Sequence, residues 1–463
     1  MKHGIRLRSD IPEIQRHHGK ATQSQPLTGE KNGPFENLGR VLSDEQWQKH
    51  CRAGLVGFNA IVTYLSQLMA HDVTRSAHMD TSFRAVTKTA QQIGSDTPVN
   101  LRNEPLLLHT VYGEGLDLDS HLFRPLHETR QRPTARFALT EVYLKTLRKK
   151  ELAPAFGMGT EQLRRSKVSL KPRLGDSRNS DHPVLMAIAT AFMRLHNVFA
   201  QQSDAQNETD KYMEARIKTI LTWHNIIRKD ILDKIAPRRI IPSDVTIDKR
   251  AKYDIVQGLF RAFHCLPISR YDLRDNNNRA LSKMLENRAS QPEYSYAAPG
   301  ETVENALSTW GEKWLIDLDF FTRSSDNTTG FAPTLPENFV LSGIFSRDLE
   351  SVRDFKVSSP GAYGALFRHT EKLLDDMRRK LPDHGKLPSP SEVPLFLAFL
   401  AEAYVKSKKA GTLGPIGASL VRSHVEDGIE VARKILEETL PFGAVQAWES
   451  RVPKDFAELL TVI

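Results

Sequence analysis

Apolar residues along the chain recur with the spacing of helices. From Asp44 onward they return every three or four positions, which is typical of amphipathic or buried helices. One predicted helix covers roughly residues 55–75. A second follows Pro183, because proline suits the first turn of a helix, where its missing N–H has no partner to lose. Two more are predicted over about 212–235 and 252–265, each stopping before a proline.

The rest of the pattern favours one mainly helical domain with long loops and little sheet. A last pair of helices flanks the glycine-proline turn at 413–417, and loops at 323–340 and 381–391 are rich in Pro, Ser, Asn or Asp. Alternating strand patterns are scarce. Residues 1–40 are polar without a sustained period, so we expect an N-terminal extended arm there and the helical domain over 41–463.

Composition and charge exclude several classes of protein. Of the 463 residues, 40% are hydrophobic and 26% charged, which is ordinary for a folded core. Two cysteines fit a reducing compartment. With no apolar leader and no run of about eighteen apolar residues, we expect cytoplasmic residence and no membrane span. The net charge of +8 is spread over short patches without aromatic platforms, so nucleic-acid binding is not expected.

Two polar groups interrupt the apolar pattern of the helix at 55–75. Gln67 and His71 are four residues apart and therefore share one face. A core pair satisfied by backbone or water is the commoner explanation for such an arrangement.

A polar loop, Gly-Asp-Ser-Arg-Asn-Ser-Asp-His-Pro at 175–183, leads into the very apolar second helix. Capping of that helix by Ser180, Asp181 or His182 would explain the loop without any catalytic role.

A third segment is Phe-Arg-Ala-Phe-His at 260–264, where Arg261 and His264 lie three apart. His264 stands among large apolar residues, which suits ligation of a buried haem iron. A core histidine bonded to a carbonyl would look the same and is more common.

Together these segments resemble the peroxidase–cyclooxygenase (animal haem peroxidase) superfamily, especially its bacterial members. The string at 63–72, Thr-Tyr-Leu-Ser-Gln-Leu-Met-Ala-His-Asp, is similar to the distal-helix motif of that family. Residues 175–197 resemble its distal arginine segment, with Arg178 at the arginine position. Residues 260–264 resemble its proximal histidine motif, and further similarity extends over roughly 45–425.

The resemblance implies a haem b enzyme acting on hydrogen peroxide and a small organic or halide donor. His264 would be the fifth iron ligand, and His71 would move a proton from the near to the far oxygen of peroxide as the O–O bond breaks. Arg178 would stabilise the charge on the departing oxygen, and a halide would react near Gln67. Arg261 would accompany the proximal histidine.

Several positions depart from the family pattern. Asp348 stands where the family has an asparagine that bonds the proximal histidine, although the Arg-Asp-Phe at 353–355 offers a similar register. A carboxylate there would make His264 a stronger ligand. Ala70 replaces an aspartate that esterifies haem, and Asp181 replaces a glutamate at the second ester position. The resemblance therefore implies at most one ester to the haem.

Two further departures bear on metal and substrate. Asp72 matches a calcium ligand of the family, but the loop at 103–113 lacks the other oxygen ligands, which argues against calcium and favours a structural role for Asp72. Arg261 stands where the fatty-acid dioxygenase branch has its radical tyrosine, which disfavours that chemistry.

Three functions remain open from sequence. The first is a haem peroxidase. The second is a haem-dependent oxygenase, dioxygenase or metabolite-tailoring oxidase with one defined substrate. The third is a non-catalytic helical protein whose basic surface binds an acidic partner and whose peroxidase-like residues are remnants.

Overall fold

The structure is a computed structural model that describes most of the chain. The described residues are 33–74, 106–113, 115–116, 119–123, 133–157, 171–180, 182–237, 249–273, 278–281, 303–341, 343–354, 356–439 and 443–463. Most of the predicted N-terminal arm therefore lies outside them. Its last residues are helical, because α1 begins at Pro34, so helix starts before the predicted boundary at residue 40.

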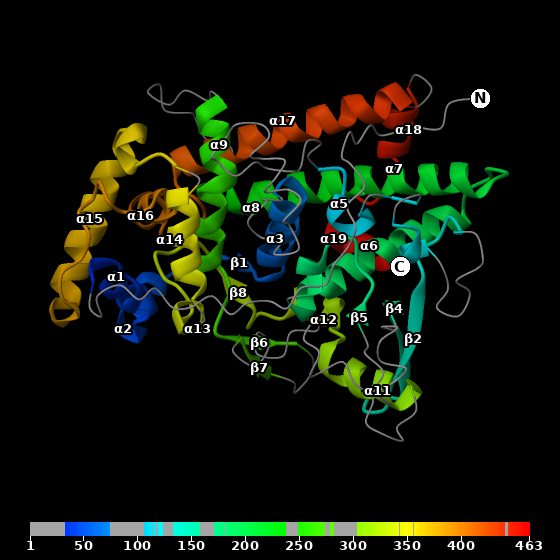
Figure 1. The fold of residues 1–463 in the computed structure, drawn as a ribbon, viewed down its shortest axis with the longest axis horizontal. Coiled ribbons are helices and arrows are strands. Elements are labelled where there is room, and N and C mark those ends of the chain that lie inside the picture. Colours follow the sequence, from blue (N-terminus) through cyan, green and yellow to red (C-terminus); the bar gives the residue numbers. More distant parts are fainter. Residues whose placement is uncertain are drawn as a thin grey trace.

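Helices dominate, as the sequence predicts (Figure 1). The α-helices are α1 (Pro34–Ser43), α2 (Glu45–Arg52), α3 (Ile61–Val73), α5 (His109–Tyr112), α6 (Pro183–Gln201), α7 (Glu208–Ile226), α8 (Asp233–Ile235), α9 (Lys249–Gln257), α11 (Val303–Trp314), α12 (Leu318–Arg323), α13 (Glu337–Leu341), α14 (Ile344–Asp354), α15 (Ala365–Lys380), α16 (Leu395–Lys406), α17 (Pro415–Thr439), α18 (Ala444–Glu449) and α19 (Phe456–Val462). The tighter 3₁₀ turns are η2 (Ser120–Phe123), η3 (Ser177–Ser180), η5 (Leu259–Cys265), η7 (Pro360–Tyr363) and η8 (Pro382–His384), and η4 (Ile227–Leu232) is a π-helical turn.

The sheet is confined to antiparallel strand pairs among the described residues, in keeping with the predicted fold class. The strands are β1 (Phe58–Asn59), β2 (Leu139–Leu144), β3 (Lys149–Pro154), β4 (Phe156–Gly157), β5 (Lys171–Pro172), β6 (Arg270–Asp272), β7 (Asn278–Ala280) and β8 (Thr328–Thr329). β2 pairs with β3, β1 with β8, β4 with β5 and β6 with β7. The β2–β3 hairpin carries a small separate core against α11.

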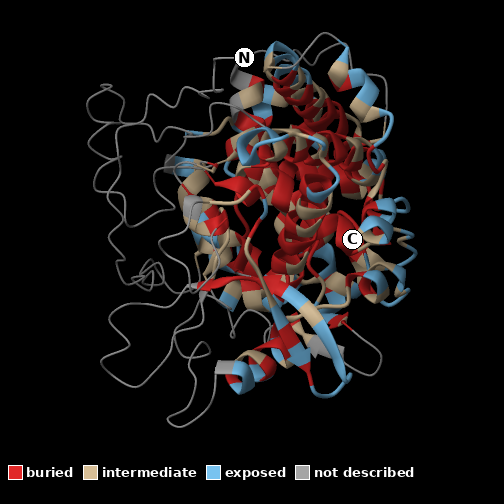
Figure 2. Ribbon diagram, turned by 90° about the vertical axis from the view of Figure 1, so that its right-hand side faces the viewer, coloured by how far each residue is buried: buried red, intermediate tan, exposed pale blue. Residues whose placement is uncertain are grey.

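The centre of the molecule is built from α3, α6 and α7, in which α6 packs against both α3 and α7. Buried residues fill this centre, and exposed ones lie on the outer helices and the hairpin (Figure 2). α6 begins at Pro183, as predicted, and the ring of His182 caps it by accepting the Val184 N–H at 3.3 Å. Of the three capping residues considered from sequence, the structure shows His182 in that role.

α6 also answers the question of membrane spans. Among the described residues it alone is long and apolar enough to cross a membrane, and 78% of the apolar stretch is buried inside the protein. The sequence showed no uninterrupted apolar run here because Arg194, His196 and Asn197 lie within the helix. Burial of this kind is typical of a core helix.

Two predicted helices are interrupted in the structure. The helix predicted over 212–235 begins earlier, at Glu208, and passes through the π turn η4 before ending as α8. The helix predicted over 252–265 is wrong as a single helix. α9 ends at Gln257, and after Gly258 the chain tightens into η5, where the Arg261 N–H bonds the Gly258 carbonyl three residues back. Glycine weakens helix continuity at this point.

The predicted pair of helices around the turn at 413–417 is present as α16 and α17. Buried Glu402 of α16 joins them, since its two carboxylate oxygens accept the N–H groups of Ile416 at 2.8 Å and Gly417 at 3.0 Å. A negative charge here satisfies free N–H groups and opposes the helix dipole of α17. Gly414 must lack a side chain, because a Cβ there would lie 2.3 Å from the Glu402 Cγ.

Candidate functional site

One stripe of the central helix α3 is accessible, while the rest of the helix is buried. The partly exposed residues are Gln67, Ala70 and His71, together with Thr74 just beyond the end of the helix. Their spacing of three and four places them on one face. Both predicted distal residues, Gln67 and His71, therefore lie on the open face of an otherwise buried helix.

The turn η5 has the same property. Its apolar residues and Cys265 are buried, and only Arg261 and His264 are partly exposed. In a 3₁₀ turn, side chains three apart eclipse one another, so these two side chains share one edge. η5 packs against α3, so the two open stripes belong to neighbouring elements.

His264 is held by a buried carboxylate. Its Nδ1 lies 2.6 Å from Oδ2 of Asp348, which is 3% exposed and belongs to α14. The other oxygen, Oδ1, accepts a hydrogen bond of 2.9 Å from Nη1 of Arg261. The structure thus joins the three predicted proximal residues, and it selects Asp348 over the alternative register at 353–355.

The charge state of Asp348 fixes the proton on His264. Burial raises the pKa of the Asp348 carboxyl, but the neighbouring charges and hydrogen bonds of His264 and Arg261 outweigh this and lower it overall. An ionised carboxylate can only accept, so Nδ1 of His264 carries a proton, and in the neutral ring Nε2 is then the atom with the lone pair. Nε2 has no hydrogen-bond partner within the described part of the chain.

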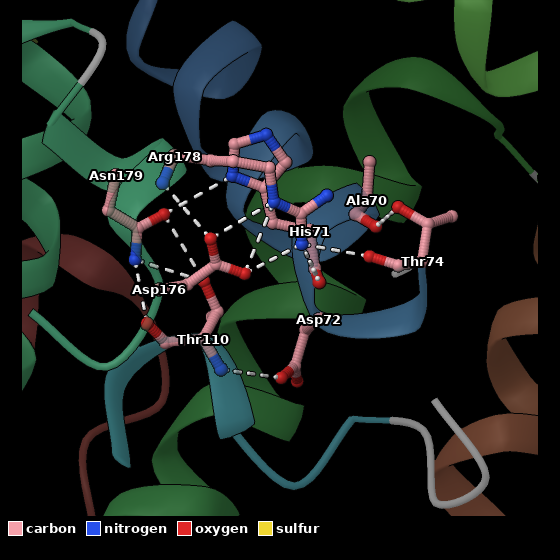
Figure 3. A network of polar contacts seen from close by, with 8 residues as sticks. All are labelled: Ala70, His71, Asp72, Thr74, Thr110, Asp176, Arg178 and Asn179. Carbon is pink, nitrogen blue, oxygen red and sulfur yellow. Dashed lines mark hydrogen bonds and ion pairs between the residues drawn. The ribbon is translucent and has the colours of Figure 1, made fainter. Parts of the chain in front are cut away.

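On the distal side, His71 contacts an amide. Its Nδ1 lies 3.2 Å from Oδ1 of Asn179, which is fully buried in η3. Asn179 in turn is bonded to Thr110 of α5, and Figure 3 shows the three residues meeting where α3, η3 and α5 converge. His71 is therefore oriented by a neutral partner.

Arg178 ties the end of α3 to η3. Its Nη2 donates to the carbonyl oxygens of His71 at 3.0 Å and Thr74 at 2.8 Å, and it forms an ion pair of 2.7 Å with Asp176 (Figure 3). Nε also donates to Asp176. Nη1 has no partner among the residues the structure describes, so it is the atom with which Arg178 could contact a ligand.

Asp72 is fully buried, although it follows the partly exposed His71 directly in α3. Its Oδ2 accepts the Leu108 N–H at 2.9 Å and the Trp223 indole N–H at 3.3 Å, and its Oδ1 accepts the Thr110 N–H at 3.3 Å. These donors carry partial positive charge and take the place that a cation would occupy. The arrangement does not fit calcium, which needs six or more oxygen ligands.

The loop that supplies these N–H groups is strained. Leu106 and Leu108 have φ of 62° and 53°, in the left-handed region that side chains other than glycine rarely adopt. His224 donates from Nε2 to the Leu106 carbonyl oxygen, 2.9 Å away, because a carbonyl can only accept. Trp223 and His224 thus hold both this loop and Asp72 in place.

Two positions were considered for an ester bond to haem. Asp181, the candidate ester residue, lies outside the described residues. Ala70 lies on the open stripe of α3, and its methyl group offers no atom for an ester bond.

Asn179 and Asp176 were not recognised from the sequence, which gave their loop a capping role. Their contacts join segments far apart in the chain: Asn179 is 69 residues from Thr110 and 108 from His71. No local pattern in the loop signals such partners. The only hint was its position beside Arg178.

Comparison with solved structures shows which known proteins share the fold of this chain. No protein-family model matches the sequence, and no curated protein does. Among solved structures, Peroxidase A from Dictyostelium discoideum is 12% identical, with a TM-score of 0.53 over 94% of this chain and 89% of that one. This chain has the fold of the animal-type haem peroxidases.

Fatty acid alpha-dioxygenases share that peroxidase fold. The enzyme from Oryza sativa is 12% identical, with a TM-score of 0.50 over 93% of this chain and 79% of that one. The enzyme from Arabidopsis thaliana is 13% identical, with a TM-score of 0.51 over 87% and 71%. The resemblance seen in the sequence is thus confirmed as a fold, and its bacterial branch stays a prediction. Because one fold carries both activities, it does not choose between them.

Proposed function

We propose that this protein is a haem-dependent oxidoreductase that reduces hydrogen peroxide and oxidises a small organic or halide donor. The observation that carries the proposal is the bond between His264 and Asp348. It leaves Nε2 of His264 with a lone pair on the open edge of η5, which is the arrangement of a metal-ligating histidine with its carboxylate partner.

The residues present fit haem b. His264 would hold the iron, and Arg261 would keep Asp348 ionised beneath it. The open stripe of α3 presents only Gln67, the small Ala70 and His71, so no bulky side chain of that face stands in the way of a flat cofactor. Ala70 excludes an ester from α3, which leaves ligation and burial as the main means of retention.

Bound haem would supply the iron centre that takes up the two oxidising equivalents of peroxide. The chain's own work would be proton transfer and charge stabilisation. His71 would accept a peroxide proton at Nε2 and return it to the departing oxygen. Arg178, already anchored by Asp176, would donate from Nη1 to the charge that develops there.

An oxygenase is the second candidate, because the fold is shared with fatty acid alpha-dioxygenases. Arg261 argues against the tyrosine-radical route of that branch. Its guanidinium is committed to Asp348 and to the Gln257 carbonyl, 2.9 Å from Nε. An oxygenase here would have to abstract hydrogen by another path.

The deciding experiment is an absorption spectrum of the protein expressed with ample haem, before and after one equivalent of hydrogen peroxide. We expect a Soret band that shifts promptly and returns when a phenolic donor or a halide is added. Oxygen uptake with a fatty acid, but no response to peroxide, would favour the oxygenase. A colourless protein would support the non-catalytic alternative, in which the peroxidase-like residues are remnants.

A further inference from the structure

We propose that Asn179 is the positioning residue of the distal site and that it fixes His71 in the tautomer with the proton on Nδ1. The inference rests on the proposed function for its catalytic meaning, but its geometric content is independent of that function. Asn179 touches neither the open face of η5 nor the predicted iron ligand, so it acts through His71.

The orientation of the Asn179 amide follows from its partner. One end of the amide lies 2.8 Å from the backbone carbonyl of Thr110. A carbonyl can only accept, so the atom facing it is the nitrogen Nδ2. The other end, 3.2 Å from Nδ1 of His71, is then the oxygen Oδ1. The Thr110 hydroxyl, within reach of both ends, completes the bonding of an amide that has no contact with solvent.

The amide oxygen in turn decides the proton on His71. An amide oxygen has no proton to give, so the Nδ1 atom of His71 must be the donor. In the neutral ring the lone pair is then on Nε2, at the opposite edge of the imidazole. This is the nitrogen that a general base needs, and the tautomer is imposed by buried groups and not by chance.

The nearby carboxylate does not compete for this role. Asp176 is bound by Arg178 through Nε at 3.0 Å and Nη2 at 2.7 Å, so its charge is balanced by the guanidinium (Figure 3). Asn179 gives His71 a neutral acceptor that orients the ring. The ring can therefore take a proton at Nε2 and give it back.

His71 would carry one proton from one oxygen of peroxide to the other. Nε2 of His71 removes one proton from hydrogen peroxide, so an O–H bond breaks and an N–H bond forms while Nδ1–H stays on Asn179. The same proton then passes to the departing oxygen as the O–O bond breaks, and that oxygen leaves as water. Peroxide would be the oxidant, and its remaining oxygen and two oxidising equivalents would be taken up at the iron that His264 would hold.

The tautomer can be observed directly. In the diamagnetic ferrous carbonyl form of the holoprotein labelled with [¹⁵N]histidine, protonated and unprotonated ring nitrogens resonate at well-separated shifts, and His71→Gln identifies the His71 signals by their loss. We expect the proton on Nδ1 in the native protein. A proton on Nε2 would overturn the proposal, whatever any variant does.

Three variants connect the tautomer to the chemistry. Asn179→Leu keeps the size but removes the acceptor, and it should mix the tautomers and slow the reaction with peroxide by about 10- to 100-fold, since a misplaced base loses much of its effect. Asn179→Asp keeps an acceptor and should keep Nδ1–H, but its charge would hold a second proton on His71 and its other oxygen would face the Thr110 carbonyl, so the reaction should stay slow. The control Ser180→Ala removes a hydrogen bond of 2.7 Å to the Ser177 carbonyl in the same turn. It should change neither the tautomer of His71 nor the rate of reaction with peroxide.

The outcomes separate this inference from the proposed function. If Asn179→Leu folds, binds haem and keeps both the native tautomer and the native rate, Asn179 does not position His71. If the native protein takes up no haem, the proposed function fails, and the same histidine spectrum of the haem-free chain still tests the Asn179–His71 bond. If Asn179→Leu does not fold, the native tautomer and the Asn179→Asp variant decide.

Discussion

The two histidines of this site are held by partners of opposite electrostatic character. His264 donates to the ionised carboxylate of Asp348, which also pairs with Arg261. His71 donates to the neutral amide of Asn179, and the carboxylate of the same loop, Asp176, pairs with Arg178. In both cases Nδ1 is the donor and Nε2 keeps the lone pair.

The difference indicates a division of labour. A carboxylate partner increases the basicity of an imidazole and strengthens it as a permanent metal ligand. An amide partner orients the ring without adding a negative charge, which suits a group that must both take and release a proton. A histidine is thus suited to metal ligation or to proton transfer according to whether its Nδ1 partner is a carboxylate or an amide.

The largest expected effect comes from removing either histidine. His264→Ala should abolish haem retention, because no other described side chain on the open edge of η5 can ligate iron. His71→Ala should keep haem but slow the reaction with peroxide by a hundredfold or more, on the order of what a positioned base contributes. Soret absorbance after gel filtration and stopped-flow kinetics measure the two. Full haem retention in His264→Ala would refute the ligand assignment.

The next effect tests the charge of the proximal partner. Asp348→Asn keeps an acceptor for His264 but leaves Arg261 without its buried counter-charge, so we expect a loss of about 3 kcal/mol in the free energy of unfolding at pH 7. The iron reduction potential should rise as His264 becomes a weaker donor. Chemical denaturation measures the unfolding free energy, and redox titration measures the potential. An unchanged potential would contradict the claim that Asp348 strengthens His264 as a ligand.

The pH dependence of stability should also distinguish the native protein from Asp348→Asn. The pKa of Asp348 is lowered in the folded state, so its stabilising contribution is complete above the ordinary aspartate value of about 4 and is lost as pH falls through the lowered value. The native protein should therefore lose stability faster than Asp348→Asn below about pH 4. Parallel acid titrations, followed by circular dichroism, would show whether the two curves converge.

A smaller effect concerns Asp72, the buried carboxylate next to His71. Asp72→Asn should cost about 2 kcal/mol of unfolding free energy, because an amide nitrogen would face N–H donors. Trp223→Phe removes only one of those donors and should cost about 1 kcal/mol. Calcium and a calcium chelator should leave the native melting temperature unchanged. A rise in melting temperature with calcium would contradict our interpretation of this site.

Much of the fold could be predicted because its signals are local. Pro183 marks the start of α6, and the three-residue spacing of Arg261 and His264 keeps them on one edge even though the predicted helix is a 3₁₀ turn. The break itself was missed because Gly258 alone does not end a helix. Asp348 was found from the family register, and the structure supports that register.

The distal contacts could not be predicted, because they depend on tertiary geometry. Asn179 is held by Thr110, which belongs to a distant segment. The N–H donors around Asp72 require left-handed backbone at Leu106 and Leu108, where a turn would ordinarily be announced by glycine or asparagine. Leucine gives no such signal. The sequence could therefore suggest a structural role for Asp72, but not the N–H donors that bind its carboxylate.

The bonding of Asp72 also has a consequence for how the protein matures. Three donors that hold this carboxylate in the described part of the chain belong to the chain itself, so these contacts at the end of α3 form as the polypeptide folds. If haem is the cofactor, assembly then has a single external requirement. The supply of haem, and not of calcium, would set how much active protein a cell can make.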